Sequence, residues 1–95
     1  MGTKKEKCEQ LVVEVPLPDG CLSMYVGEVV RRDANSITLR KASWIACTGR
    51  RHLFFAGQPD STAEVEPYPD ATEIELPRQG AILTSWAHEL LRTVR

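Results

Sequence analysis

Residues 24–47 read MYVGEVVRRDANSITLRKASWIAC, and this stretch decides the fold. Met24 and Val26 share one parity, whereas Tyr25 has the other, and the alternation continues over several residues. A period of two is the signature of a β-strand, because successive side chains point to opposite faces of a sheet. Turn-forming residues at 33–35 interrupt the pattern, and β-branched residues then resume it. The stretch therefore predicts a β-hairpin that runs on into a third strand.

Turn signals on either side of this stretch mark the remaining strands. Proline, aspartate and glycine at positions 18–20 favour a tight turn, so the apolar residues before them form a first strand. Gly27, inside the second strand, indicates a bulge or a close approach between backbones. Strands are predicted at 10–15, 21–32, 36–41 and 70–76, and residues 80–84 form a further strand or a turn. Residues 42–47 either continue the third strand or begin another after a bend.

Two helices complete the predicted fold. Residues 50–56 favour a short helix, with Thr48 as its candidate N-cap and Gly57 as its candidate C′ residue. Residues 85–94 predict a terminal helix, because apolar residues recur there every four positions and would bury one stripe. Those residues are Trp86, Leu90 and Val94.

The fold class predicted from these elements is mainly β. Residues 10–95 are expected to form one domain, a small rolled antiparallel sheet or a barrel-like fold with a short internal helix and a C-terminal helix. Residues 1–9 are expected to be a frayed tail. A chain of 95 residues has a small core, so self-association is expected to bury more apolar area and to cover strand edges.

Composition also bounds the cellular setting. No run of about 18 apolar residues is present, which argues against a membrane span, and no apolar stretch follows the N-terminal lysines as in a signal peptide. Three widely spaced cysteines do not form a disulfide framework and favour a reducing compartment. The predicted location is therefore the cytoplasm.

Charge is segregated along the chain although the net charge is −1. Residues 28–52 contain six Lys or Arg and two acids, whereas residues 53–77 contain six acids and no Lys or Arg. The two stretches can neutralise each other within one subunit, or meet between neighbouring subunits in a head-to-tail ring. A third interpretation leaves the basic face free for an anionic ligand.

The first candidate binding site is the segment TGRRH, residues 48–52. Backbone N–H groups, two guanidiniums and an imidazole would meet there at the start of a short helix, an arrangement suited to phosphate. The alternative is a solvated basic loop that pairs with the acidic half. The candidate ligand-binding residues are Arg40, Lys41, Thr48, Gly49, Arg50, Arg51 and His52.

No motif in the sequence indicates catalysis or a metal site. Neither GxxxxGK[ST] nor GxGxxG is present, and the potential zinc ligands lack the close pairs typical of zinc sites. Those residues are Cys8, Cys21, Cys47, His52 and His88. Buried structural cysteines are the expected role, and the Cys47–His52 spacing alone is a weak signal for a nucleophile pair. The sequence therefore predicts no enzyme, no cofactor and no metal.

Aromatic residues are the candidates for a subunit interface. Trp44 and Trp86 are expected in the core or at such an interface, because tryptophan buries a large area and anchors contacts. Tyr68, held between two prolines, is expected either to flank a pocket or to pack as a loop aromatic. Nucleic-acid binding along the basic residues 31–51 is disfavoured by the acidic balance and the few aromatics.

Several short segments of the chain form a recognisable set. They are Gly27-Glu28-Val29, Leu39-Arg40-Lys41-Ala42 with Trp44, Gly49, Leu53-Phe54-Phe55, Gly57-Gln58-Pro59, Ile74 and Trp86. Together these segments resemble small phage and prophage proteins of uncharacterised function. The resemblance covers roughly residues 27–86 and implies a small β-rich protein from a mobile element, acting in the host cytoplasm. It implies no catalytic residues.

The sequence thus predicts a homo-oligomeric, phage-type binding protein that sequesters a small anionic, nucleotide-like molecule as a counter-defence protein would. Two alternatives stay open. One is a structural protein that acts through self-assembly without a small ligand, and the other is a nucleic-acid-binding accessory protein.

Overall fold

A computed structural model describes residues 8–95, so most of the predicted N-terminal tail lies outside the described residues. It shows six antiparallel strands in one sheet and a single short helix, which confirms the mainly β prediction. The elements are β1 (Gln10–Pro16), β2 (Leu22–Arg32), β3 (Ser36–Cys47), α1 (Arg51–Phe55), β4 (Glu64–Pro67), β5 (Glu73–Pro77) and β6 (Ile82–Ser85).

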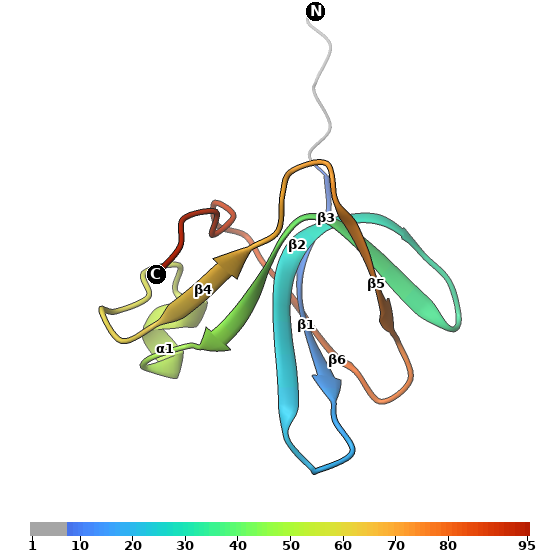
Figure 1. Ribbon diagram of the computed structural model, residues 1–95, viewed down its shortest axis with the longest axis horizontal. Coiled ribbons are helices and arrows are strands. Elements are labelled where there is room, and N and C mark those ends of the chain that lie inside the picture. The colour runs from blue at the N-terminus through green and yellow to red at the C-terminus, as the bar shows by residue number, and fades with distance from the viewer. Residues whose placement is uncertain (1–7) are drawn as a thin grey trace, which may run out of the picture.

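The sheet is organised around β3, its longest strand. The strand order is β4-β3-β2-β1-β6, and β5 also pairs with β3. The first half of β3 pairs with β5 and its second half pairs with β4, so these two strands lie one after the other along the same edge (Figure 1). Lys41 separates the halves and has a φ of 49°. β3 is nevertheless one strand from Ser36 to Cys47, so residues 42–47 continue the third strand, which was one of the two predicted outcomes.

The β2–β3 hairpin closes as the sequence indicates. The Asp33 carboxylate accepts the backbone N–H groups of Asn35 (2.8 Å) and Ser36 (2.9 Å) across the turn. These two hydrogen bonds hold the pKa of Asp33 below its ordinary value. At Gly27 the register shifts, and an added Cβ would lie 3.0 Å from the Cβ of Ala42. The bulge and the close approach predicted for Gly27 therefore both occur.

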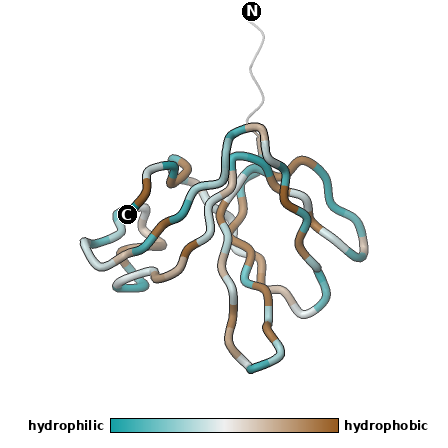
Figure 2. Tube along the Cα trace, viewed as in Figure 1, coloured by the Kyte–Doolittle hydropathy of each residue, from teal (hydrophilic) through white to brown (hydrophobic). Residues whose placement is uncertain are grey.

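Two hydrophobic clusters lie on opposite faces of the sheet, because neighbouring residues of one strand supply both. On β1, Val13 belongs to the first cluster and Val12 to the second. The first cluster contains Leu11, Val13, Val15, Ile37, Leu39, Ala42 and Leu76. The second contains Val12, Met24, Val26, Ile45, Phe54, Val65 and Trp86. Hydrophobic residues follow the strands, and hydrophilic residues gather at the hairpin turns (Figure 2).

The predicted barrel-like closure of the sheet is wrong. Among residues 8–95, β5 pairs only with β3 and β6 pairs only with β1, so the sheet is open. Both strands are short, and Pro77 at the end of β5 has no N–H to offer a further strand.

Helix α1 begins later than predicted. Its N-cap is Arg50 rather than Thr48, and no side chain caps it. The Thr48 hydroxyl instead donates to the carbonyl of Gly49 (3.0 Å). At the other end, the N–H groups of Gly57 and Gln58 donate to the last helical turn at 2.9 Å each, which confirms Gly57 as the C′ residue of a Schellman motif.

The predicted C-terminal helix is wrong. Residues 86–95, here called the C-terminal strap, contain no helix and cross the sheet from β6 to β4. The Trp86 N–H donates to the carbonyl of Gln10 (3.0 Å), and Arg95 and Val65 exchange two backbone hydrogen bonds of 3.1 Å. The chain therefore ends beside β4 (Figure 1). Backbone groups that a helix would pair internally are paired with the sheet instead.

Within the described part of the chain, no helix has the length and apolar character needed to cross a membrane.

Candidate functional site

The predicted anion-binding turn already holds a carboxylate of the chain itself. Asp60, in the loop after α1, accepts the backbone N–H of Arg50 at 3.2 Å. Gly49 has a φ of 66°, and a Cβ at this position would lie 2.2 Å from Asp60 Oδ1. Glycine is therefore needed both for the backbone conformation and to admit the carboxylate.

Thr62 fixes Asp60 in this position. Its hydroxyl and its backbone N–H donate to Asp60 Oδ1 at 2.6 and 2.9 Å. The Thr62 hydroxyl, then the Thr62 N–H and then the Arg50 N–H lower the pKa of Asp60. The Asp60 carboxylate is therefore ionised at neutral pH. Binding of a nucleotide phosphate here stays a prediction, and it requires displacement of the Asp60 carboxylate.

Arg51 is directed toward the sheet. Its guanidinium donates to both carboxylate oxygens of Glu14, at 3.2 and 3.1 Å, and lies 5.1 Å from the centroid of the Phe55 ring. Glu14 is buried on β1. A buried carboxylate needs a paired charge, so Arg51 has a structural partner within the chain. His52, the next residue, is exposed.

Arg40 and Lys41 do not join this turn. Arg40 donates to Glu28 on β2 at 3.0 Å and to the Cys8 sulfur at 3.6 Å. The hydrogen bond that Arg40 donates to Glu28, more than the one it donates to Cys8, raises the pKa of Arg40. At about 3.3 Å per strand residue, Arg40 lies roughly 25 Å from Thr48 along β3. The candidate ligand-binding residues are therefore divided between two places.

The expected neutralisation within one subunit is partial. The ion pairs of the described residues are Arg32–Glu9, Arg40–Glu28, Arg51–Glu14 and Arg92–Asp70. None of them joins the basic stretch 28–52 to the acidic stretch 53–77. The two stretches meet in the sheet, where Arg40 lies opposite Glu73 on β5, and at the Arg50–Asp60 hydrogen bond.

The cysteines are not buried as the sequence suggested. Cys8, Cys21 and Cys47 are all exposed and free, because they lie at the ends of strands rather than in either cluster. The His88 ring packs edge-on against Trp86 and lies 3.0 Å from the carbonyl of Phe55. In residues 8–95, no three His, Cys, Asp or Glu side chains are grouped as metal ligands.

The six aromatic residues are divided between the two faces of the sheet. Phe54, Phe55 and Trp86 gather in or against the second cluster. Trp86 is 3% exposed, so it belongs to the core and not to a surface contact, which decides between its two predicted roles. Trp44 differs from Trp86, because it is 40% exposed. It is exposed although β3 is paired at this position with β2 on one side and with β4 on the other.

Trp44 belongs to a row of side chains here called the aromatic strip, made of Tyr25, Trp44, Glu66 and Tyr68. Tyr25 on β2 and Glu66 on β4 lie directly opposite Trp44 on β3. Tyr68 follows Glu66 by two residues, so it faces the same side. Burial, and to a smaller extent the nearby Tyr25, raise the pKa of Tyr68. Tyr25 and Tyr68 pack on the first cluster, whereas Trp44 is exposed to solvent.

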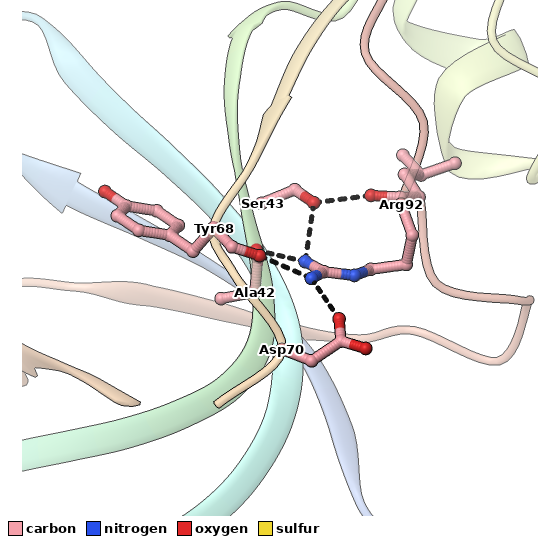
Figure 3. A network of polar contacts seen from close by, with 6 residues as sticks. Ala42, Ser43, Tyr68, Asp70 and Arg92 are labelled. Atoms are coloured by element: carbon pink, nitrogen blue, oxygen red, sulfur yellow. Dashed lines mark hydrogen bonds and ion pairs between the residues drawn. The ribbon is translucent and has the colours of Figure 1, made fainter. Parts of the chain in front are cut away.

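Arg92 of the C-terminal strap holds the backbone from which Tyr68 projects. Its guanidinium donates to the carbonyls of Ala42 and Tyr68, to the Ser43 hydroxyl and to Asp70 (2.7 Å). The Tyr68 ring points to the other side of β3 (Figure 3). The sequence did not predict this role of Arg92, because its pattern assigned Arg92 to a helix. The acceptors lie more than twenty residues away, and no local pattern indicates them.

The chain matches no protein-family model, no curated protein and no solved structure. The resemblance to phage proteins therefore stays a prediction.

Proposed function

We propose that this protein is a non-catalytic interaction module that self-associates, and that the aromatic strip is its contact surface. The observation that carries the proposal is the exposure of Trp44, which lies on the same face of the sheet as Tyr25 and Tyr68. The proposal corresponds to the self-assembly alternative predicted from the sequence.

The energetics favour covering this surface. With 40% of a side chain of roughly 250 Å² in water, about 100 Å² of Trp44 remains to be buried. At about 25 cal/mol per Å², covering that area contributes about 2.5 kcal/mol. The strip is too small to form a whole interface, since stable contacts bury about 1,200–2,000 Å² in total. Its role is that of a central anchor, which tryptophan and tyrosine commonly have.

The position of the strip also supports the proposal. β2, β3 and β4 are packed on their other face by α1 and the C-terminal strap, through Phe54, Trp86 and Leu91. Trp44 therefore projects from a backbone that is held on both sides and behind. A rigid platform reduces the conformational entropy lost on association.

The test is the oligomeric state, measured by light scattering after size exclusion from about 10 μM to 1 mM. We expect a concentration-dependent oligomer, and we expect Trp44→Ala to weaken it at least tenfold, as about 1.4 kcal/mol of lost burial would. Ile82→Ala is the matched control, because Ile82 is 51% exposed and lies outside the strip. Equal urea midpoints would show that both variants are folded. A monomer at 1 mM, or equal weakening by both variants, would refute the proposal.

A further inference from the structure

We infer that the aromatic strip takes a cationic side chain, an arginine or lysine of a second copy of this chain. The inference rests on the proposed function and names the chemistry of the partner at the same surface.

Aromatic faces and carboxylates are brought together in the strip. The faces of tryptophan and tyrosine rings are electron-rich and attract cations within about 6 Å of the ring centroid. Glu66 lies directly opposite Trp44, and Glu64 precedes it by two residues on the same strand. Both glutamates are exposed, and neither forms an ion pair with any residue of the range 8–95.

Next to the strip, no Lys or Arg of β2 or β4 lies on the same side of the sheet among the described residues. Around the strip, the register places only small or uncharged side chains on the same side. These residues are Ser23, Gly27, Ala42 and Ala46. Electron-rich rings and two acids thus lie together without a base among them. A phosphate-bearing ligand would be repelled here, which disfavours nucleic acid despite the stacking surface.

The chain carries cations that suit this surface. Arg31 on β2 and Lys41 on β3 are exposed, and neither has a carboxylate within ion-pair distance among the described residues. Arg31 lies six residues from Tyr25, about 20 Å along an extended strand. A contact between the strip of one copy and Arg31 of the next would join two different patches of the surface, which is compatible with the head-to-tail ring, one of the interpretations of the segregated charge.

The experiment uses a hexa-arginine peptide and the two indole N–H signals of the ¹⁵N-labelled protein, at a concentration where light scattering shows monomer. Trp44→Phe assigns the signals. We expect hexa-arginine to shift the Trp44 signal and to leave that of the buried Trp86. Glu66→Gln should weaken the apparent affinity about threefold, as expected for one exposed charge. Glu75→Gln, an exposed acid on β5 outside the strip, is the matched control and should have no effect.

Hexaglutamate and a hexathymidylate oligonucleotide complete the test. If either shifts the Trp44 signal as strongly as hexa-arginine, or if Glu75→Gln weakens binding as much as Glu66→Gln, the inference is wrong. Peptide binding by a protein that stays monomeric at 1 mM would show a cation-binding strip whose occupant is not a second copy, which overturns both the proposed function and this inference. Self-association that depends on Trp44 without any response to hexa-arginine would overturn this inference alone and leave the proposed function standing.

Discussion

At the scale of single residues, Arg92 satisfies more backbone groups than its place in the sequence suggests. Its side chain is 24% exposed and donates to two carbonyls, a hydroxyl and a carboxylate. The carbonyl of Ala42 also accepts the Tyr68 N–H (2.9 Å), so one buried strand position ties β3, the end of β4 and the strap together. Removal of the guanidinium takes a charged donor from each of these acceptors, which costs more than one surface hydrogen bond.

We predict that Arg92→Ala lowers the free energy of unfolding by about 2–4 kcal/mol, since buried acceptors lose a charged donor. Arg92→Lys should lose an intermediate amount, because an ammonium cannot reproduce the planar fork. Urea denaturation measures both. Arg78→Ala is the control, because the Arg78 guanidinium donates only to the Asp33 carbonyl (2.7 Å) at the surface. A loss at Arg92 no larger than the loss at Arg78 would show that the network contributes little.

At the scale of elements, the C-terminal strap covers the second cluster without secondary structure of its own. Gln10 donates to the carbonyls of Trp86 (3.0 Å) and His88 (2.8 Å), and Ser43 donates to that of Leu91. Leu90 and Leu91 pack on the cluster, whereas Val94 is 68% exposed. In the predicted helix, Leu90 and Val94 would share the buried stripe and Leu91 would lie beside it. In the strap, therefore, Leu91 rather than Val94 contributes to the packing of the second cluster.

This difference gives the second prediction. Leu91→Ala should destabilise the protein by about 1–3 kcal/mol, because a partly buried leucine loses its packing. Val94→Ala, at an exposed position, should change stability by less than about 0.5 kcal/mol. Thermal or urea unfolding of the two variants measures both values. Equal losses, or a larger loss at Val94, would favour a helix in this segment over the strap.

At the scale of the whole molecule, two small hydrophobic clusters pack on the two faces of one sheet. Because both clusters are small, the loops are held by polar contacts as well as by packing. Asp33 closes the β2–β3 turn and Asp60 closes the turn before α1, and the pKa of each is lowered by hydrogen bonds to the ionised carboxylate. Each pKa is lower in the folded than in the unfolded chain. The stability that each carboxylate contributes is therefore present above the unfolded value, about 3.9, and is lost as pH falls through the folded value.

We therefore predict that the urea midpoint falls as the pH is lowered below about 4. In the double variant Asp33→Asn/Asp60→Asn the fall over the same range should be smaller, because its side-chain amides accept hydrogen bonds but do not titrate. The fall of the urea midpoint in each single variant should be intermediate between that of the double variant and that of the parent. Identical pH profiles for the parent and the double variant would exclude these two turns as the source.

The sequence by itself determined the elements whose cause is local. Alternation in residues 24–47 specified the central hairpin, Gly27 marked the bulge, and Gly57 marked the end of α1. Strand period, turn residues and a C′ glycine act between residues close in the chain, so a single sequence displays them.

Only the tertiary structure decided the rest, because the deciding contacts join distant segments. Trp44 and Trp86 are equally hydrophobic, but the strap buries one in the second cluster and β3 leaves the other in the aromatic strip. Asp60 accepts the backbone N–H of Arg50, which lies ten residues before it in the chain. Arg92 donates to the carbonyl of Ala42, which lies fifty residues before it. The period of four in residues 86–94 favoured a helix locally. Backbone hydrogen bonds to β1 and β4, together with burial of Trp86 against Phe54, stabilise the strap instead.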